Sequence, residues 1–418
     1  VVKNISLNKL IRQSMDHLKE MLRRRKVGHS LEGDFYHSQA VLDIELKAIF
    51  EKEWVFVGNS SEIPNSGDYI TATVGRNSVI LLKKKTGKIV AFLNSCRHRG
   101  SLICLDKKGH TNQLVCPYHQ WTYDQDGALI HAGEMSASFD PENHSLKSVN
   151  LENMSGMVYV CVAKNPPDFE EFRKQVEPYI SPHQPFRCKI AFEESIVEEA
   201  NWKLVVENNR ECYHCEAAHP ELTFSLTSFA LPDDPRADGF FTELMPRMAN
   251  KWESLGLPHK PVPGGDKFRC IRLPFINDAL SMTIDGSLAC RRLLGDLKEK
   301  DLGSARMFHV PGNWNHFCSD YILHASVTPI SPDKTLLTTK WLVHEDAVEG
   351  WDYDIDHLAG VWQATNEQDS KLASNNHLGT KSVGYEPGPY SGSEFMLTDF
   401  TNWYSGMLEK YIDEKNAK

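Results

Sequence analysis

The chain has 418 residues, of which 41% are hydrophobic and 24% are charged, and its formal net charge is −10. This length and composition indicate a globular protein of roughly two or three domains. The acidic balance argues against nucleic acid as a partner. The sequence contains no run of about eighteen apolar residues, so we expect no membrane-spanning helix and no membrane partner.

The N-terminal stretch VVKNISLNKLIRQSMDHLKEMLRRRKVG is amphipathic with a basic end, and it lacks the apolar centre of a secretory signal. We expect residues 1–45 to form a helical segment that packs on the largest domain, residues 164–418. The ten cysteines are scattered along the chain, unlike the dense framework of a small secreted fold. These two observations favour a cytoplasmic protein.

Short β-forming segments dominate the next part of the chain. NSVILLKK and KIVAFLNS flank a turn at Thr86-Gly87, GMVYVCVA is rich in β-forming residues, and Asp126-Gly127 is a strong hairpin signal. Proline is then concentrated in KNPPDFEEF and YISPHQPF, which is typical of a connector. We therefore predict a small all-β domain over residues 46–163.

Two loops of this domain each carry one cysteine and one histidine. Cys96 and His98 lie in CRHRGSLICL, and Cys116 and His119 lie in CPYHQ. A structural zinc ion is one interpretation, but zinc fingers usually pair like ligands within a loop. A [2Fe–2S] cluster in which two histidines replace two cysteines on one iron requires this mixed set. We therefore predict that these four residues hold a Rieske cluster.

A second group of possible ligands follows in NWKLVVENNRECYHCEAAHPEL, which contains Glu207, Glu211, His214 and His219. Two imidazoles and one carboxylate form the facial triad of non-haem iron(II), with positions open for dioxygen and substrate. Residues five apart on a regular α-helix lie about 140° apart, so the two histidines converge only if the helix is interrupted. Pro220 favours such an interruption. The alternative is a solvated helical face with two incidental histidines.

Both motifs resemble those of the terminal oxygenase (alpha) components of Rieske non-haem iron oxygenases. The resemblance implies an α+β fold: a Rieske domain over residues 46–163 and a helix-grip catalytic domain over residues 164–418, with an antiparallel sheet flanked by helices. Strands broken by proline-rich turns in His309–Val343 fit that sheet. Ser101 and Tyr118 stand where high-potential Rieske proteins carry an extra disulfide, which implies a cluster of lower potential.

The resemblance also assigns roles within the second motif. The family pattern fits from Glu207 to His219 with one departure, since Glu211 stands where the family usually has aspartate. This carboxylate is implied to link a cluster histidine of one subunit to an iron-ligand histidine of its neighbour. The third iron ligand is implied to be an aspartate at the start of a later helix. Asp369, 150 residues after His219, is our choice, and Glu367 is its rival.

The stretch NNRECYHC resembles the branch of the family that acts on quaternary ammonium compounds. That branch implies a homotrimeric monooxygenase that uses O₂ and NAD(P)H electrons from a separate flavin and iron–sulfur reductase. The expected reaction hydroxylates an N-methyl group of a betaine, such as glycine betaine or stachydrine, and releases formaldehyde. No Gly-rich dinucleotide fingerprint follows a strand here, which agrees with a separate reductase.

Aromatic faces are the expected binding site for a quaternary ammonium group. Trp314, Phe317 and Tyr321 are the candidates, although aromatic residues in a sheet usually belong to the core. Four other functions remain open: an aromatic-ring dioxygenase alpha subunit, a carnitine- or choline-type monooxygenase, a Rieske electron carrier without enzyme activity, and a structural zinc protein. Metal content separates the classes, with about three irons per chain for an oxygenase and about two for a carrier.

Overall fold

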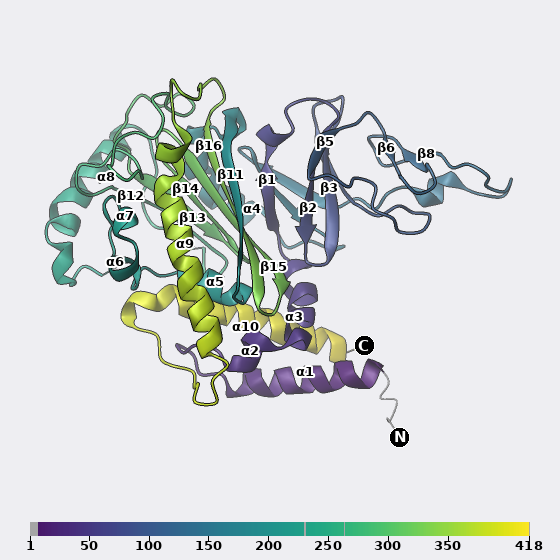
Figure 1. Ribbon diagram of the computed structural model, residues 1–418, viewed down its shortest axis with the longest axis horizontal. Coiled ribbons are helices and arrows are strands. Elements are labelled where there is room, and N and C mark those ends of the chain that lie inside the picture. The colour runs from purple at the N-terminus through teal and green to yellow at the C-terminus, as the bar shows by residue number, and fades with distance from the viewer. Residues whose placement is uncertain (1–6, 230, 263, 418) are drawn as a thin grey trace.

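The computed structural model describes residues 7–229, 231–262 and 264–417 (Figure 1). The first six residues of the predicted N-terminal helical segment lie outside the described residues. A large sheet with helices on its faces forms one part of the molecule, and smaller sheets form the other. The predicted α+β class, with a β-rich domain beside a helix-flanked antiparallel sheet, is confirmed. Among the described helices, none is long and apolar enough to cross a membrane.

The chain begins with helices that pack against its C-terminal helix, α10 (Phe395–Asn416). Leu18 and Met21 of the first helix are fully buried in one core with Phe400 and Tyr404 of α10. The N-terminal segment thus packs on the part of the chain after residue 164. The helices of this layer are α1 (Leu7–Arg24), α2 (Gly33–His37) and α3 (Gln39–Glu45), followed by the π-helical turn Leu46–Phe50.

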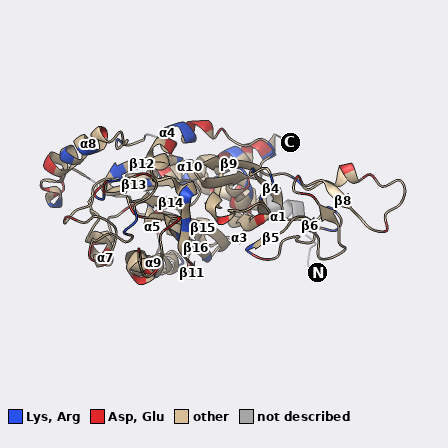
Figure 2. Ribbon diagram, turned by 90° about the horizontal axis from the view of Figure 1, so that it is seen from above, with Lys and Arg blue, Asp and Glu red and all other residues tan. Residues whose placement is uncertain are grey.

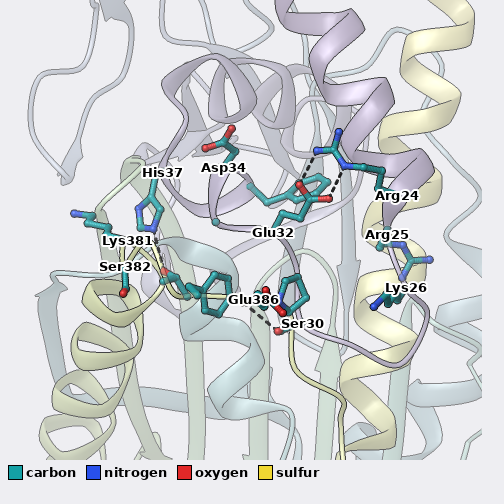
Figure 3. A pocket seen from close by; sticks show the side chains of 15 residues that line it. Arg24, Arg25, Lys26, Ser30, Glu32, Asp34, His37, Lys381, Ser382 and Glu386 are labelled. Carbon is teal, nitrogen blue, oxygen red and sulfur yellow. Dashed lines mark hydrogen bonds and ion pairs between the residues drawn. The ribbon is translucent and has the colours of Figure 1, made fainter.

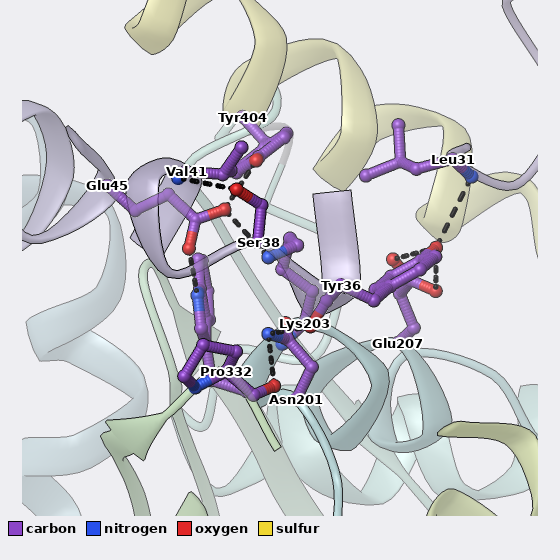
Figure 4. Close-up of polar contacts among 11 residues, drawn as sticks. Leu31, Tyr36, Ser38, Val41, Glu45, Asn201, Lys203, Glu207, Pro332 and Tyr404 are labelled. Atoms are coloured by element: carbon purple, nitrogen blue, oxygen red, sulfur yellow. Dashed lines mark hydrogen bonds and ion pairs between the residues drawn. The ribbon is translucent and has the colours of Figure 1, made fainter. Parts of the chain in front are cut away.

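A buried ion pair fastens this helical layer to α5 (Trp202–Asn209) (Figure 4). Lys203 Nζ donates a hydrogen bond of 2.7 Å to Glu45 Oε1, and both side chains are 0% exposed. The hydroxyl of Tyr404 and the indole N–H of Trp202 also donate to this carboxylate, at 2.5 and 2.8 Å. Because every partner is buried, removal of one charge would leave the other uncompensated at a cost of about 3–5 kcal/mol.

Three small antiparallel sheets form the β-rich part. Gly87 and Gly127 have φ values of +83° and +79°, so both predicted turns use glycine where the backbone is left-handed. The sheets have the strand orders β1-β10-β9, β4-β3-β2-β5 and β6-β7-β8. Their strands are β1 (Val55–Asn59), β2 (Asp68–Val74), β3 (Asn77–Lys83), β4 (Ile89–Leu93), β5 (Lys108–His110), β6 (Leu114–Val115), β7 (Thr122–Tyr123), β8 (Leu129–His131), β9 (Asn150–Met154) and β10 (Met157–Cys161).

The large sheet has six antiparallel strands in the order β11-β16-β15-β14-β13-β12. Two helices cover it from opposite sides, α9 (Ile355–Gly379) and α4 (Glu170–Ile180) (Figure 2). The other helices are α6 (Cys215–Ala218), α7 (Pro220–Thr223) and α8 (Met245–Ser254). The strands are β11 (Cys188–Glu198), β12 (Phe268–Leu273), β13 (Ser304–His309), β14 (Asn313–Phe317), β15 (Ile322–Ser331) and β16 (Lys334–His344).

Alternation along the strands separates two cores. Leu323 and Trp341 pack with α9, whereas their neighbours Ile322 and Leu342 pack with α4. Successive side chains of a strand point to opposite faces, so the identity of each face follows from the residue parity. Only side chains on the α9 face of the sheet can approach the candidate iron site.

Candidate functional site

The two Cys-His loops of the β-rich part bring their four side chains together. Cys96 and Cys116 are free thiols that are only 4% and 1% exposed. His98 and His119 are exposed at the tips of the loops, and their ring centroids lie 4.7 Å apart. Each loop is closed by its own backbone, since Gly100 N donates to Cys96 O at 2.9 Å and the other loop has the same closure.

The surroundings of the two sulfurs fit a bound cluster. Burial raises the pKa of the Cys116 thiol, whereas the backbone N–H groups of Tyr118 and His119 lower it by donating to the sulfur. The hydroxyl of Tyr123 lies 3.3 Å from Cys96 Sγ. Backbone and hydroxyl donors directed at sulfur are the usual setting of an iron–sulfur cluster. These residues therefore fit a [2Fe–2S] group with sulfur ligands on the inside and imidazoles on the outside.

A second group of ligands lies on the α9 side of the large sheet. Nε2 of His219 lies 2.9 Å from Asp369 Oδ1, Nε2 of His214 lies 3.3 Å from the same oxygen, and the two nitrogens are 3.1 Å apart. Ligands at about 2.1 Å from a metal and at right angles to one another would be about 3.0 Å apart. The three atoms therefore fit one face of an octahedron, the geometry of the facial triad.

The backbone explains how the two histidines converge. Helix α5 ends at Asn209, and two single-turn helices, α6 and α7, then follow one after the other. His219 separates these turns with φ −127° and ψ 67°, and Pro220 begins α7. The interruption that the five-residue spacing required is present, and it turns His219 back toward His214.

Each histidine is oriented through its other ring nitrogen. Nδ1 of His214 lies 2.5 Å from Glu211 Oε1, and Nδ1 of His219 lies 2.8 Å from Gln368 Oε1. Donation from Nδ1–H to these oxygens leaves both Nε2 lone pairs for a metal. Sequence reasoning missed Gln368, whose only sequence signal is its position beside Asp369.

The electrostatics of the site favour a cation. Burial by itself lowers the pKa of His214, but Asp369 and Glu211 raise it to about 9. Burial likewise opposes the negative charge of Asp369, and the two imidazoles lower its pKa. A site with this demand for positive charge suits a divalent metal ion.

Asp369 and not Glu367 faces the histidines. Asp369 Oδ1 is buried and, among the described residues, has no hydrogen-bond partner apart from the two imidazoles. Glu367 is exposed and pairs with Lys371 at 2.8 Å on the surface of α9. One expectation was wrong: Asp369 lies in the middle of α9, which begins at Ile355. Helix α9 starts earlier because the side chain of Asp354 caps it by accepting from His357 N at 3.2 Å.

A disulfide between Cys212 and Cys215 encloses His214 in the chain, and the sequence analysis did not anticipate it. Cys215 lies close enough to both histidines to be considered as a metal ligand, since the three donor atoms are within 4.8 Å of one another. Its sulfur is already bonded to Cys212, so it offers no thiolate. The carboxylate of Asp369 is therefore the better third ligand.

The three aromatic residues chosen as a substrate pocket are not brought together. Trp314 lies on the α9 face of the sheet but packs in the core beneath α5. Phe317 is buried on the opposite face with α4. Tyr321 is fully buried, and its hydroxyl accepts from Trp362 Nε1 at 3.2 Å. Parity places Phe308 and His316 on the same face as Trp314, and the sequence analysis named neither.

Two cavities lie away from both metal groups. The larger, of about 790 Å³, lies between the end of α1 and the segment after α9, and charged side chains surround it (Figure 3). The smaller, of about 240 Å³, lies between strands β1 and β2 of the β-rich part and the large sheet. Neither lining contains any of the predicted metal ligands.

The candidate cluster site and the candidate iron site lie at opposite ends of the folded molecule. Strand β6, which leads into the second Cys-His loop, lies with β8 at one end of the molecule in Figure 1, and α6 and α7 are at the other. The large sheet lies between them. One copy of the chain therefore does not place its two metal groups side by side.

Two family models match the chain, and each contains one of the metal groups. The model described as the Rieske [2Fe-2S] domain matches residues 53–150. The model described as the ring hydroxylating alpha subunit (catalytic domain) matches residues 186–410. Cys96, His98, Cys116 and His119 fall in the first range, and the predicted iron triad falls in the second.

Similar proteins are known over nearly the whole length. The glycine betaine monooxygenase oxygenase subunit of Chromohalobacter salexigens is 46% identical over 400 residues, 95% of this chain and 90% of that protein. The protein of the same name from Pseudomonas aeruginosa (strain UCBPP-PA14) is 42% identical over 419 residues, 100% and 98% of the two chains. A crystal structure of the quaternary ammonium Rieske monooxygenase CntA with L-carnitine has a TM-score of 0.71 at 22% identity, covering 93% of this chain and 98% of that chain. The structural likeness shows the fold.

Proposed function

Because the chain belongs to the Rieske oxygenase alpha subunits, we propose that it is the oxygenase subunit of a glycine betaine monooxygenase. The support for this substrate is the likeness to proteins of that name over nearly the whole chain. The convergence of His214, His219 and Asp369 within 3.3 Å separates an oxygenase from an electron carrier, which needs only the cluster. A structural zinc protein would need neither this second site nor the Rieske domain match.

The reaction balances as an N-demethylation. Glycine betaine, O₂, NADH and a proton give dimethylglycine, formaldehyde, water and NAD⁺. One oxygen atom enters an N-methyl C–H bond, and the hemiaminal that results loses a proton and breaks its C–N bond to release formaldehyde. When bound, the [2Fe–2S] cluster supplies electrons one at a time and the iron(II) supplies the site where dioxygen is activated.

The residues of the chain divide this work between two centres. We assign Cys96, His98, Cys116 and His119 to the cluster. His214, His219 and Asp369 hold the iron, and each histidine is kept in the tautomer that leaves Nε2 free by Glu211 or Gln368. The exposed edges of His98 and His119 are the route by which electrons leave the cluster.

The assembly follows from the separation of the two centres. Since one copy keeps them at opposite ends, the electron must pass between copies, from a cluster histidine of one subunit through Glu211 of the next. A head-to-tail ring satisfies this requirement at every interface, and we propose a homotrimer. Electrons enter from a separate NAD(P)H-dependent reductase. We retain residues 46–163 and 164–418 as the two proposed domains, with residues 1–45 as the N-terminal segment.

Product analysis with a surrogate reductase tests the function. Purified protein with O₂, NADH and glycine betaine should form dimethylglycine and formaldehyde in a ratio of one to one, measured by mass spectrometry. Carnitine, choline, stachydrine and an arene serve as competing substrates in the same assay. Preferred turnover of carnitine, or formation of a cis-dihydrodiol from the arene, would overturn the assignment.

A further inference from the structure

An arginine without a partner lies within the large sheet, on the side of the iron site. Arg306 belongs to β13, an interior strand, and its backbone pairs with His316 of β14. The side chain makes no hydrogen bond or ion pair among the described residues, and its Nε and Nη2 atoms are buried. The residue as a whole is still partly accessible although helices cover the sheet. A guanidinium whose buried donors are unpaired is able to bind an anion.

The position of Arg306 relates it to the iron ligands. His316, its cross-strand neighbour, lies against Trp362 of α9 with ring centroids 4.7 Å apart. Trp362 precedes Asp369 by seven residues, so the two lie on the same side of α9, about 10 Å apart along the helix axis. Arg306 and the triad therefore lie on the same side of the large sheet, the side that α9 covers.

A second buried guanidinium lies on the same face of the sheet. Arg210 is 2% exposed, and its guanidinium carbon lies 3.7 Å from the centroid of the Phe308 ring. Its Nη1 and Nη2 atoms are buried and have no partner among the described residues. Phe308 is two residues after Arg306, so both arginines are on the α9 face of the sheet.

Unpaired burial of two positive charges is costly, and no carboxylate among the described residues pairs with either guanidinium. Burial lowers the pKa of Arg306 to about 10 and that of Arg210 to about 9. A buried charge is normally paired or hydrogen-bonded. The Phe308 ring already stabilises the Arg210 cation, whereas Arg306 has neither an aromatic nor an acidic partner among the described residues.

We propose that Arg306 is the receptor for the carboxylate of the substrate, with Arg210 as a second positive charge on the same face of the sheet. The proposal rests on the proposed function, because it places the trimethylammonium end of a betaine toward His214, His219 and Asp369. Three bonds join the carboxylate carbon of glycine betaine to a methyl carbon, a span of about 4 Å. Together with a hydrogen bond of about 2.9 Å to Arg306, the ligand reaches about 7 Å from the guanidinium. Arginine binds carboxylate through two parallel N–H donors.

Binding of two ligands to the metal-loaded enzyme tests the proposal. Glycine betaine and choline carry the same trimethylammonium group, but only glycine betaine has a carboxylate. Arg306→Gln should raise the Kd of glycine betaine about 10- to 100-fold, the usual effect of one charge-assisted pair, and should leave choline binding unchanged. Arg306→Lys should recover part of the affinity. An unchanged Kd for glycine betaine in Arg306→Gln would overturn the receptor.

Arg269→Gln is the matched control. Arg269 lies on the same face, opposite Phe308 in the adjacent strand, but it already pairs with Asp399. This variant should bind glycine betaine as the wild type does. Iron content and the thermal midpoint are measured for each variant, so that loss of the fold is recognised.

A measurement on the unmodified enzyme covers the case in which Arg306→Gln does not fold. Glycine betaine methyl ester lacks the negative charge and should bind at least about 10-fold more weakly than glycine betaine. Equal affinity would overturn the receptor. Failure of the wild type to demethylate glycine betaine would instead overturn the proposed function, and so the two failures are distinguishable.

Discussion

Oε1 of Glu211 lies 2.5 Å from Nδ1 of His214, on the side of the ring opposite the candidate iron position. Glu211 is therefore not a ligand in this arrangement, because it is separated from the metal by the width of an imidazole. It orients His214, and its own side chain is 12% exposed. The glutamate in place of the usual family aspartate keeps the charge and lengthens the reach by one methylene.

Loss of one iron ligand should separate the two centres experimentally. His214→Ala should abolish turnover and reduce iron from about three to about two per chain, since Asp369 and His219 alone make an incomplete triad. The red-brown absorbance of the cluster should remain. Disappearance of that colour in a protein that is still folded would show that His214 belongs to the cluster and that the division into two sites is wrong.

Loss of one cluster ligand should have the opposite signature. Cys116→Ser replaces a buried thiolate with an oxygen, a poor ligand for an iron–sulfur cluster. Acid-labile sulfide should fall from two per chain toward zero, whereas the mononuclear iron stays bound. Cys104→Ser is the matched control, because Cys104 is another buried free cysteine near the loops. Retention of both sulfides in Cys116→Ser would exclude this ligand.

The buried ion pair of the helical layer should be sensitive to the loss of one partner. Lys203→Met leaves Glu45 buried without its counter-charge, and we expect the free energy of unfolding to fall by about 3–5 kcal/mol. Lys203→Met combined with Glu45→Gln should recover much of this loss, because no charge is then left unpaired. Urea unfolding followed by circular dichroism measures both. Equal stability of Lys203→Met and the wild type would contradict the pairing.

Glu207 should make stability depend on pH in a direction unusual for a carboxyl group. Burial raises the pKa of Glu207 to about 8, although Lys203 and a hydrogen bond from Tyr36 oppose the shift. The native state therefore keeps a proton that the unfolded chain loses above its pKa of 4.5. Stability from this group is complete below about pH 4.5 and falls by about 1.4 kcal/mol per pH unit up to about pH 8.

Glu207→Gln isolates that contribution, since an amide keeps the shape without titrating. The groups facing Glu207 are Lys203 from α5, Tyr36 from α2, Tyr404 from α10, and Tyr385 and Tyr390 from the segment after α9. The variant should lose less stability than the wild type between pH 5.5 and pH 7.5 in urea unfolding. A wild type whose stability falls no more than that of the variant would contradict a protonated Glu207.

Much of the candidate site could be predicted from short sequence motifs, whereas the remaining residues depend on long-range contacts. Cys96 and His98 lie within one short segment, as do His214 and His219, so the sequence alone predicts that each pair binds metal. The roles of Gln368 and Arg306 depend on tertiary structure. Gln368 contacts His219, and Arg306 lies on the α9 side of the sheet through its pairing with His316. Phe317 was chosen beside Trp314 in sequence, but a difference of three residues changes the face of a strand.

Domain class was also predictable, whereas element boundaries were not. Alternating segments and glycine turns predicted the β-rich part, and the turns are where Gly87 and Gly127 placed them. The resemblance implied that the ligand aspartate opens its helix, but Asp354 caps α9 fifteen residues before Asp369. The Cys212–Cys215 disulfide has no local signal that distinguishes it from two free thiols.

The bridge through Glu211 is tested most directly by its isosteric amide. Glu211→Gln keeps the length of the side chain but removes the charge that holds the Nδ1–H of His214. Both metal sites should stay occupied and chemical reduction of the cluster should stay fast. Glu211→Asp serves as the charge-retaining comparison and should recover activity only in part, because a hydrogen bond tolerates little beyond about 3.2 Å.

The deciding measurement is rapid-mix absorbance of the prereduced cluster after addition of O₂ and glycine betaine. In the wild type the cluster should reoxidise within a single turnover as electrons pass to the iron site. In Glu211→Gln that reoxidation should slow by orders of magnitude, while iron and sulfide contents match the wild type. Reoxidation of Glu211→Gln at the wild-type rate would contradict the bridge between the two centres and leave Glu211 as a carboxylate that only orients His214.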